Sequence, residues 1–254
     1  MPDTLPKRIL LIACEIVHRE LCALSSVSPR IVDLVFLPKG LHEIGAEEMR
    51  AQIQAEIDKA DPSKYEFIAL GYGLCNNGAL ALTARQIPLV IPRAHDCITF
   101  FFGSRRLYRQ YFDANPGTYY RTTGWSERGA AKPGESIMSQ LGLDKTYNEY
   151  VEKYGKENAD YIMNVLGGWR QHYKKLTYIA MPLSGLPDYT ESARAEAAEN
   201  GWLFELLPGD LSILKALTTG EWDSGEFVVV PPGCTLGPAP DDEIFSTLPP
   251  KDSP

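Results

Sequence analysis

The stretch that decides the fold is FIALGYGLCNNGALALTARQIPLVIPRAHDCITFFFG, residues 67–103. It holds one arrangement twice: a short apolar run, then polar groups with a cysteine, then a segment with the composition of a helix. The apolar runs, residues 67–70 and 89–91, have the length and composition of buried strands. If both strands are parallel, the polar groups that follow them lie at the carboxyl edge of a sheet. Open α/β sheets bind their ligands at that edge.

Similar apolar runs alternate with helical patterns on both sides of this stretch. Runs at 8–13, 31–37, 176–180, 202–207 and 227–230 are separated by helical patterns at 16–24, 46–60, 98–112, 191–200 and 210–217. In the clearest helix, Met49, Ile53 and Ile57 fall on one face. Residues 118–121 suit an edge strand, and 122–134 have the composition of a loop. The alternation predicts an α/β fold: a mostly parallel, doubly wound, Rossmann-like sheet with helices on both faces.

Two segments depart from this alternation. Residues 143–173 are polar and rich in Tyr, Lys, Glu and Asn, and they fit two amphipathic helices around Gly155. We expect a helical insertion there, within a single domain that spans residues 1–240. Residues 241–254 are rich in proline and acids, which predicts a disordered tail.

Composition limits the partners. The chain has 254 residues and a formal net charge of -8, which disfavours nonspecific binding to nucleic acid. It holds no apolar stretch of the roughly 18 residues that a membrane helix needs. The N-terminal apolar run is too short for a signal peptide. We therefore expect a cytoplasmic protein that acts on a small molecule and has neither nucleic acid nor membrane as a partner.

The cysteines are the first candidates for chemistry. There are five, an odd number, and a chain of this size does not need disulfides. All except Cys22 follow a predicted strand, and strand ends converge in a parallel sheet. Cys14, Cys75 and Cys97, with His95, could hold Zn²⁺, or the thiolates could hold an iron–sulfur cluster. The alternative is that these cysteines are packed as small apolar residues, since no CxxC pair occurs.

The glycine-rich loop between the two strands has two interpretations. Gly71 and Gly73 could bring the backbone close to a phosphate or another part of a cofactor at a helix N-terminus. They could equally make only a tight turn. Asn76 stands where the dinucleotide fingerprint has its third glycine, so that fingerprint fails. Asn76 and Asn77 are either turn residues or polar ligands of a bound molecule.

The second loop carries candidate catalytic groups. His95 could be a metal ligand or an acid–base group, and Asp96 could orient its imidazole. Arg93 could bind a substrate carboxylate or phosphate, or pair with Asp96 as a structural ion pair. Near the N-terminus, Glu20 is a possible further ligand or base.

Several motifs together resemble one family. They are LIACEIVHREL (11–21), LGYGLCNNG (70–78), IPRAHDCITFFFGS (91–104), PGTYYRTTGW (116–125) and GEWDSGEFVVVPPG (220–233). They resemble the family of the uncharacterised domain DUF1638 over residues 8–233. The resemblance implies that Cys14, Glu20, Cys75 and residues 95–97 lie in family motifs. It also implies a context of corrinoid-dependent methyltransferases in anaerobes, with a corrinoid protein or methyltransferase as a partner.

These observations lead to three hypotheses. The first is a metalloenzyme of one-carbon or methyl-transfer metabolism, with the metal held by Cys14, Cys75, Cys97 and His95. The second is a non-catalytic accessory protein that binds a corrinoid protein or delivers a metal or cofactor, with residues 143–173 as its docking surface. The third is a metal-free enzyme that uses Cys75 or Cys97 as nucleophile and His95 as base.

Overall fold

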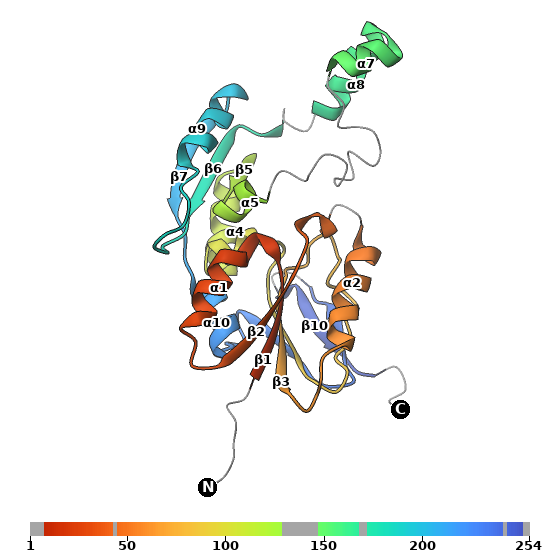
Figure 1. Cartoon of the computed structure of the whole chain (residues 1–254), viewed down its shortest axis with the longest axis vertical. Helices are drawn as coiled ribbons and strands as arrows, with labels where there is room; N and C mark the ends of the chain where they lie inside the picture. Colours follow the sequence, from red (N-terminus) through yellow and green to blue (C-terminus); the bar gives the residue numbers. More distant parts are fainter. Residues whose placement is uncertain (1–7, 43–44, 129–146, 168–171, 241–242, 251–254) are drawn as a thin grey trace. The chain divides into compact units, whose positions relative to one another are not determined.

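The computed structural model describes residues 8–42, 45–128, 147–167, 172–240 and 243–250 (Figure 1). The chain forms two compact units. The first comprises Met1–Tyr111, Met181–Leu186 and Gly209–Pro254, and the second comprises Phe112–Ala180 and Pro187–Pro208. The single domain expected over residues 1–240 remains a prediction.

The first unit is built on a five-stranded sheet in the order β2-β1-β3-β4-β8. Its strands are β2 (Ile31–Leu37), β1 (Arg8–Cys14), β3 (Tyr65–Gly71), β4 (Leu89–Pro92) and β8 (Phe227–Val230). The first four strands run parallel, and β8 pairs antiparallel with β4. The predicted mixed α/β fold with a mostly parallel sheet is therefore confirmed.

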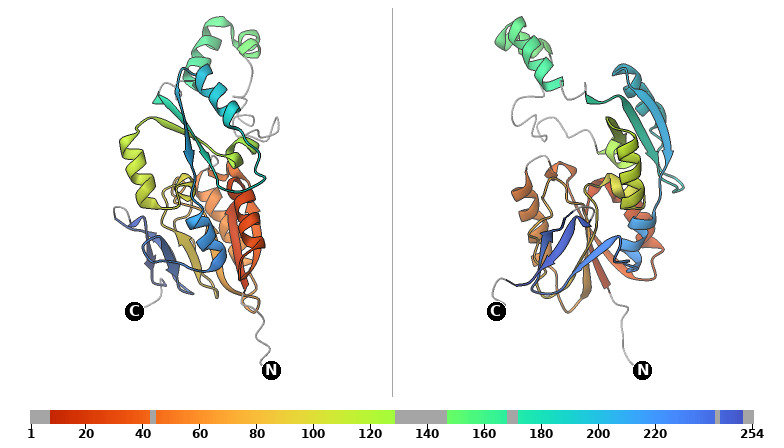
Figure 2. Two further views of the ribbon diagram at one scale, coloured as in Figure 1. Left: turned by 90° about the vertical axis from the view of Figure 1, so that its left-hand side faces the viewer. Right: turned by 180° about the vertical axis from the view of Figure 1, so that it is seen from behind.

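Helices lie on both sides of this sheet. Helix α2 (Ala46–Asp58) buries Met49, Ile53 and Ile57 in a cluster with Leu10 and Ile12 of β1. Because side chains alternate along a strand, the intervening residues of β1 face the other side. There, α1 (His18–Ser26) packs with α10 (Ser212–Thr219) and α10 contacts β1 and β3. Figures 1 and 2 show α1 and α10 together, with α2 across the sheet from them.

The connections of the first unit differ from two sequence predictions. No helix follows β3: residues 72–88 form turns, because Cys75, Asn76 and Asn77 have φ values of 43°, 57° and 65° that a right-handed helix excludes. The single helix predicted over 98–112 is two helices, α3 (Ile98–Phe101) and α4 (Arg105–Ala114). Gly103, with a φ of 67°, separates them. Short 3₁₀ turns, η1 (Glu15–Val17) and η2 (Lys39–His42), follow β1 and β2.

The predicted C-terminal tail is partly a strand. β9 (Thr235–Pro238) and β10 (Phe245–Leu248) form an antiparallel hairpin. Ile244 and Phe245 are buried in the same core cluster as α2. The prediction of disorder is therefore wrong for β10, while residues 241–242 and 251–254 lie outside the described residues.

The second unit has a three-stranded parallel sheet in the order β5-β6-β7. Its strands are β5 (Thr118–Arg121), β6 (Lys175–Ala180) and β7 (Leu203–Pro208), so β5 is an edge strand as predicted. Helix α9 (Thr190–Glu199) packs Ala193 and Ala197 against Leu176, Tyr178 and Trp202. The predicted loop at 122–134 begins instead with α5 (Thr123–Glu127), where the Thr122 side chain caps the helix by accepting from the Trp125 N–H.

The polar segment is helical, as predicted. α7 (Tyr147–Tyr154) and α8 (Lys156–Gly167) are separated by Gly155, which has a φ of 78°. No strand occurs between residues 147 and 167, whereas 143–146 and 168–171 lie outside the described residues. Across the described ranges, no helix has the length and apolar character to span a membrane.

Candidate functional site

Three loops meet at the carboxyl edge of the first sheet. β1, β3 and β4 are neighbours and parallel, so the loops that follow them leave from the same edge. Two backbone hydrogen bonds join the loop after β3 to the loop after β4. The Leu74 N–H donates to the Ala94 carbonyl (2.7 Å), and the Cys75 N–H donates to the His95 carbonyl (2.9 Å). The GYGLC and RAHDC segments therefore lie side by side, although they are about 20 residues apart in the chain.

The two glycines allow this close approach. A Cβ atom on Gly71 would lie 2.5 Å from the Cβ of Ala13 on β1. A Cβ on Gly73 would lie 2.8 Å from the Ala94 carbonyl oxygen and 3.0 Å from the backbone of Asp96. Packing thus accounts for both glycines, and the helix whose N-terminus was expected to bind an anion is not present among residues 72–88. The cofactor-binding role of Gly71 and Gly73 remains a prediction.

The turn at Cys75, Asn76 and Asn77 is left-handed at three successive residues, none of them glycine. Asparagine tolerates this conformation, but for other residues it costs on the order of 1 kcal/mol or more. The Gly78 N–H closes the turn on the Cys75 carbonyl at 3.1 Å. Both asparagine side chains are exposed, so they are available to a bound molecule, and that role remains a prediction. Strained backbone of this kind is concentrated at functional sites.

The thiol of Cys75 is the centre of the loop cluster. Burial raises its pKa to about 12, and electrostatic interactions with Cys14 and Asp96 act in the same direction. The backbone N–H groups of Gly73 and Cys97 hydrogen-bond to the sulfur and oppose this rise. The residue as a whole is partly exposed, but its thiol is enclosed by protein. The Cys75 thiol therefore lies within electrostatic range of Cys14, and the backbone N–H of Cys97 is hydrogen-bonded to its sulfur.

Tyr72 belongs to this cluster, and sequence reasoning missed it. Its side chain is buried, and its hydroxyl has no hydrogen-bond partner within the described part of the chain. Burial raises the pKa of Tyr72 well above its ordinary value, with further contributions from Cys14, Cys75 and Glu15. The available signal was its position between the two glycines of the loop.

Asp96 is held by hydrogen bonds from α3 and α4. Its carboxylate accepts hydrogen bonds from the Ile98 N–H (2.9 Å) and the Tyr108 hydroxyl (3.0 Å). It therefore ties α3 and α4 to the loop, and its expected role in orienting His95 remains a prediction. Burial is the main cause of the raised pKa of Asp96. His95 is exposed, and its side chain makes no hydrogen bond to the described residues.

Arg93 is held by the C-terminal segments of the first unit. Its guanidinium donates to the carbonyls of Ser224 (3.2 Å), Glu243 (2.6 Å) and Phe245 (2.8 Å). It also pairs with the Glu243 carboxylate at 2.9 Å. The expected alternative of an ion pair with Asp96 is replaced by these contacts, and Arg93 secures the β10 strand to the end of β4. A role in binding substrate remains a prediction.

The remaining candidates are Glu20, whose role as a ligand or base remains a prediction, and the cysteines Cys22 and Cys234. Glu20 is completely buried on α1, with an exposed fraction of 0%. Cys22 is exposed on α1, with its sulfur 3.9 Å from the His18 ring nitrogens. Cys234 follows β8, which is antiparallel, so it lies at the opposite edge, where its carbonyl accepts from the Ala84 N–H. The antiparallel direction of β8 therefore places Cys234 at the opposite edge of the sheet from the other three cysteines that follow strands.

The metal site predicted from the sequence is not assembled as a complete ligand set. Among the residues that the structure describes, no three His, Cys, Asp or Glu side chains are grouped to hold a metal ion. The five cysteines all lie in described ranges, and no disulfide joins them. What the fold provides is the Cys14–Cys75 pair, with Cys97 and His95 on the adjoining loop.

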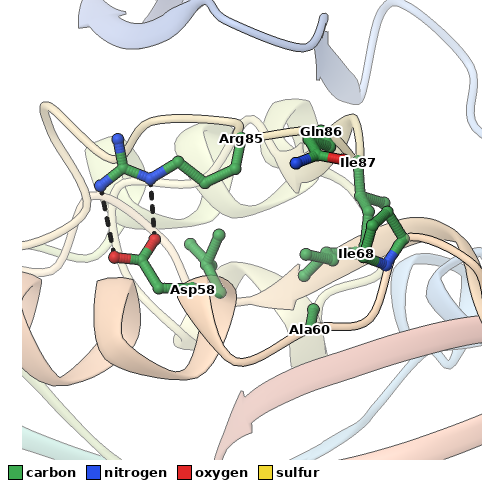
Figure 3. Close-up of a pocket in the computed structure, with 8 residues that line it drawn as sticks. Asp58, Ala60, Ile68, Arg85, Gln86 and Ile87 are labelled. Atoms are coloured by element: carbon green, nitrogen blue, oxygen red, sulfur yellow. Dashed lines mark hydrogen bonds and ion pairs between the residues drawn. The ribbon is translucent and has the colours of Figure 1, made fainter.

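A cavity lies at the other end of the sheet. It has a volume of about 210 Å³ and lies between the end of α2 and the amino ends of β3 and β4. Ile57, Ile68 and Ile87 contribute its apolar wall. On its rim, the Arg85 guanidinium binds both carboxylate oxygens of Asp58, at 2.8 and 3.3 Å (Figure 3). This ion pair lowers the pKa of Asp58.

Fold and site together define an α/β protein with a thiol-centred loop cluster at the carboxyl edge of a parallel sheet. The chain belongs to the family described as "Protein of unknown function (DUF1638)", whose family model matches residues 36–218. The resemblance noted in the sequence is thereby confirmed. The matched range includes Cys75 and residues 95–97, whereas Cys14 and Glu20 precede it. The chain matches no curated protein and no solved structure.

Proposed function

We propose that this chain is a metal-binding protein whose site is the loop cluster around Cys14 and Cys75. The observation that carries the proposal is the surroundings of the Cys75 sulfur: a second cysteine acts on it, and two backbone N–H groups point to it. Hydrogen bonds from N–H groups to sulfur stabilise and tune thiolates that bind metals. Thiolates favour Zn²⁺, with an iron–sulfur cluster as the alternative.

The charges around the site favour the binding of a cation. The electrostatic influences on Cys75 come from Cys14 and Asp96, and those on Tyr72 come from Cys14, Cys75 and Glu15. All of these groups are neutral or negative, and each of them raises the pKa of its neighbour. A bound cation would offset this repulsion and the cost of burying a thiolate. A neutral, buried thiol is a poor nucleophile, so the metal-free enzyme is less well supported.

Cysteine and histidine side chains suit a soft metal, but the described part of the chain does not group a complete set of metal ligands. Cys14 and Cys75 would supply two thiolates. Completing the site requires the side chain of Cys97 or His95 to turn towards them, since no three ligands are grouped among the described residues. A thiolate-bound Zn²⁺ supplies Lewis-acid chemistry or activates a bound thiol. His95, exposed on the adjoining loop, is placed to exchange a proton with solvent if it does not bind the metal.

The reaction that we propose is one-carbon or methyl transfer on a small molecule, with a corrinoid protein as partner. Its support is the family resemblance. We also propose that the five-stranded sheet is of the doubly wound, Rossmann-like type. The helices on both of its faces and the site at the carboxyl edge of its parallel strands support this assignment.

The test is metal analysis of protein purified without oxygen. We expect stoichiometric zinc in a colourless protein. A brown protein that contains iron and sulfide would support the proposed site but identify its occupant as an iron–sulfur cluster. Protein that contains no metal and takes up neither Zn²⁺ nor iron would overturn the proposal.

A further inference from the structure

The hydroxyl of Tyr72 is a buried donor with no acceptor supplied by the described protein. The residue is 3% exposed, and the oxygen makes no hydrogen bond to the described residues. Leaving such a group unpaired destabilises the fold, and a phenylalanine would avoid that cost. Tyr65, at the other end of β3, shows the ordinary situation: its hydroxyl donates to Asp33 at 2.8 Å and accepts from Lys64 at 2.7 Å.

The strand register places Tyr72 beside the thiols. Ala13 of β1 is opposite Gly71 of β3, so the next pair along the two parallel strands is Cys14 and Tyr72. Leu70 and Tyr72 share one core cluster with Ile12, and Cys14 and Cys75 pack against that cluster. The chain reaches Cys75 three residues after Tyr72. The phenol therefore lies on the same face of the sheet as Cys14, in the core cluster against which Cys14 and Cys75 pack.

We propose that Tyr72 is a positioning residue whose hydroxyl donates a hydrogen bond to the species held by Cys14 and Cys75. The acceptor is a thiolate sulfur or an atom bound to the metal, and this inference rests on the proposed function. Such a bond orients the ligand and stabilises its negative charge, as partners around metal ligands do. It also explains why a buried hydroxyl is present where the described protein offers it no acceptor.

The test compares Tyr72→Phe with Tyr65→Phe, two identical substitutions on one strand and its adjoining loop. Metal-stripped proteins are titrated with Co²⁺, and thiolate-to-cobalt absorption is followed. For Tyr72→Phe we expect about tenfold weaker binding and a shifted absorption band, because partners of metal ligands typically contribute 10–100-fold to affinity. Its metal-free melting temperature should be unchanged or higher. Tyr65→Phe should melt lower and bind Co²⁺ like the wild type.

The outcomes separate this inference from the proposed function. Wild-type protein that binds no Co²⁺ overturns both. Wild-type binding with an unchanged affinity and spectrum in Tyr72→Phe overturns only the role of Tyr72. A lower melting temperature of metal-free Tyr72→Phe, with an unaltered cobalt spectrum, would make the hydroxyl structural and also overturn that role.

Discussion

The pKa values of acidic groups are shifted in opposite directions at the two ends of the five-stranded sheet. At the amino end, Asp58 is paired with Arg85 and Asp33 with Lys64, and hydrogen bonds from these bases lower the pKa of both carboxyls. At the carboxyl end, burial raises the pKa of Tyr72, Cys75 and Asp96.

This difference is consistent with the proposed site at the carboxyl end of the sheet. Paired surface charges at the amino end contribute little to stability and suggest no chemistry. The groups at the carboxyl end are buried and their pKa values are raised mainly by that burial, and perturbed pKa values of this kind cluster at functional sites. The cavity in Figure 3 lies at the amino end, away from the proposed site.

The largest effect on stability is expected from Gly73→Ala. The added methyl would lie 2.8 Å from the Ala94 carbonyl and force the two loops apart. We expect a loss of about 1–3 kcal/mol in the free energy of unfolding, as for other overpacked sites. Gly40→Ala is the control, because nothing lies within 4 Å of its Cβ position. Urea unfolding that shows equal stability for both variants would contradict the packing of the two loops.

Asp96→Asn should change how stability depends on pH. The folded pKa of Asp96 lies above its ordinary value of 3.8, so its stabilising contribution is present at low pH and lost as pH rises through the folded pKa. Asparagine cannot ionise but can still accept from the Ile98 N–H. Relative to wild type, the variant should therefore gain stability from about pH 4 to neutrality. A parallel pair of stability–pH curves for metal-free protein would contradict this.

Asp58→Asn should show the opposite pH dependence and a smaller effect. The folded pKa of Asp58 is lowered, first by its hydrogen bond to Arg85, so its contribution is present above the unfolded pKa and lost in acid. Both side chains are about half exposed, at 44% and 55%, which limits the loss at pH 7 to about 0.2–1 kcal/mol. Thermal melts at pH 7 and pH 3 measure it. A difference that persists unchanged at pH 3 would argue against the ion pair.

The smallest effect on folding is expected from His95→Ala. The side chain is exposed, so removing it from metal-free protein should change the free energy of unfolding by less than about 0.5 kcal/mol. Metal affinity or activity should fall instead. The melts need metal-stripped protein, because a bound metal adds to apparent stability. A much lower melting temperature with unchanged metal content would make His95 a structural residue.

The parts that the sequence revealed are those encoded locally. The apolar runs before Cys14, Cys75 and Cys97 are strands, and they run parallel as predicted, although turns and not a helix connect β3 to β4. Strand direction is not encoded locally, so Cys234 was grouped with them although β8 runs antiparallel. The same runs do not show which sheet each strand joins, and β5, β6 and β7 form a sheet of their own.

Contacts between distant segments also escaped prediction. Arg93 is bound by Glu243, 150 positions away, and Asp96 is bound by Tyr108 of the next helix. Tyr72 was missed because its position between two glycines does not by itself show that its side chain is buried near the cysteines. Its place becomes evident only when the register sets it beside Cys14.

The most direct test compares one cysteine at each end of the sheet. Cys75 and Cys234 are both partly buried and both follow a strand. Metal-stripped Cys75→Ala and Cys234→Ala are titrated with Co²⁺ beside wild type, with thiolate-to-cobalt absorption as the signal. We expect Cys75→Ala to lose at least tenfold in affinity, because it removes a proposed ligand, and Cys234→Ala to match wild type. Equal binding by the two variants, or a loss confined to Cys234→Ala, would contradict the assignment of the site to the carboxyl edge.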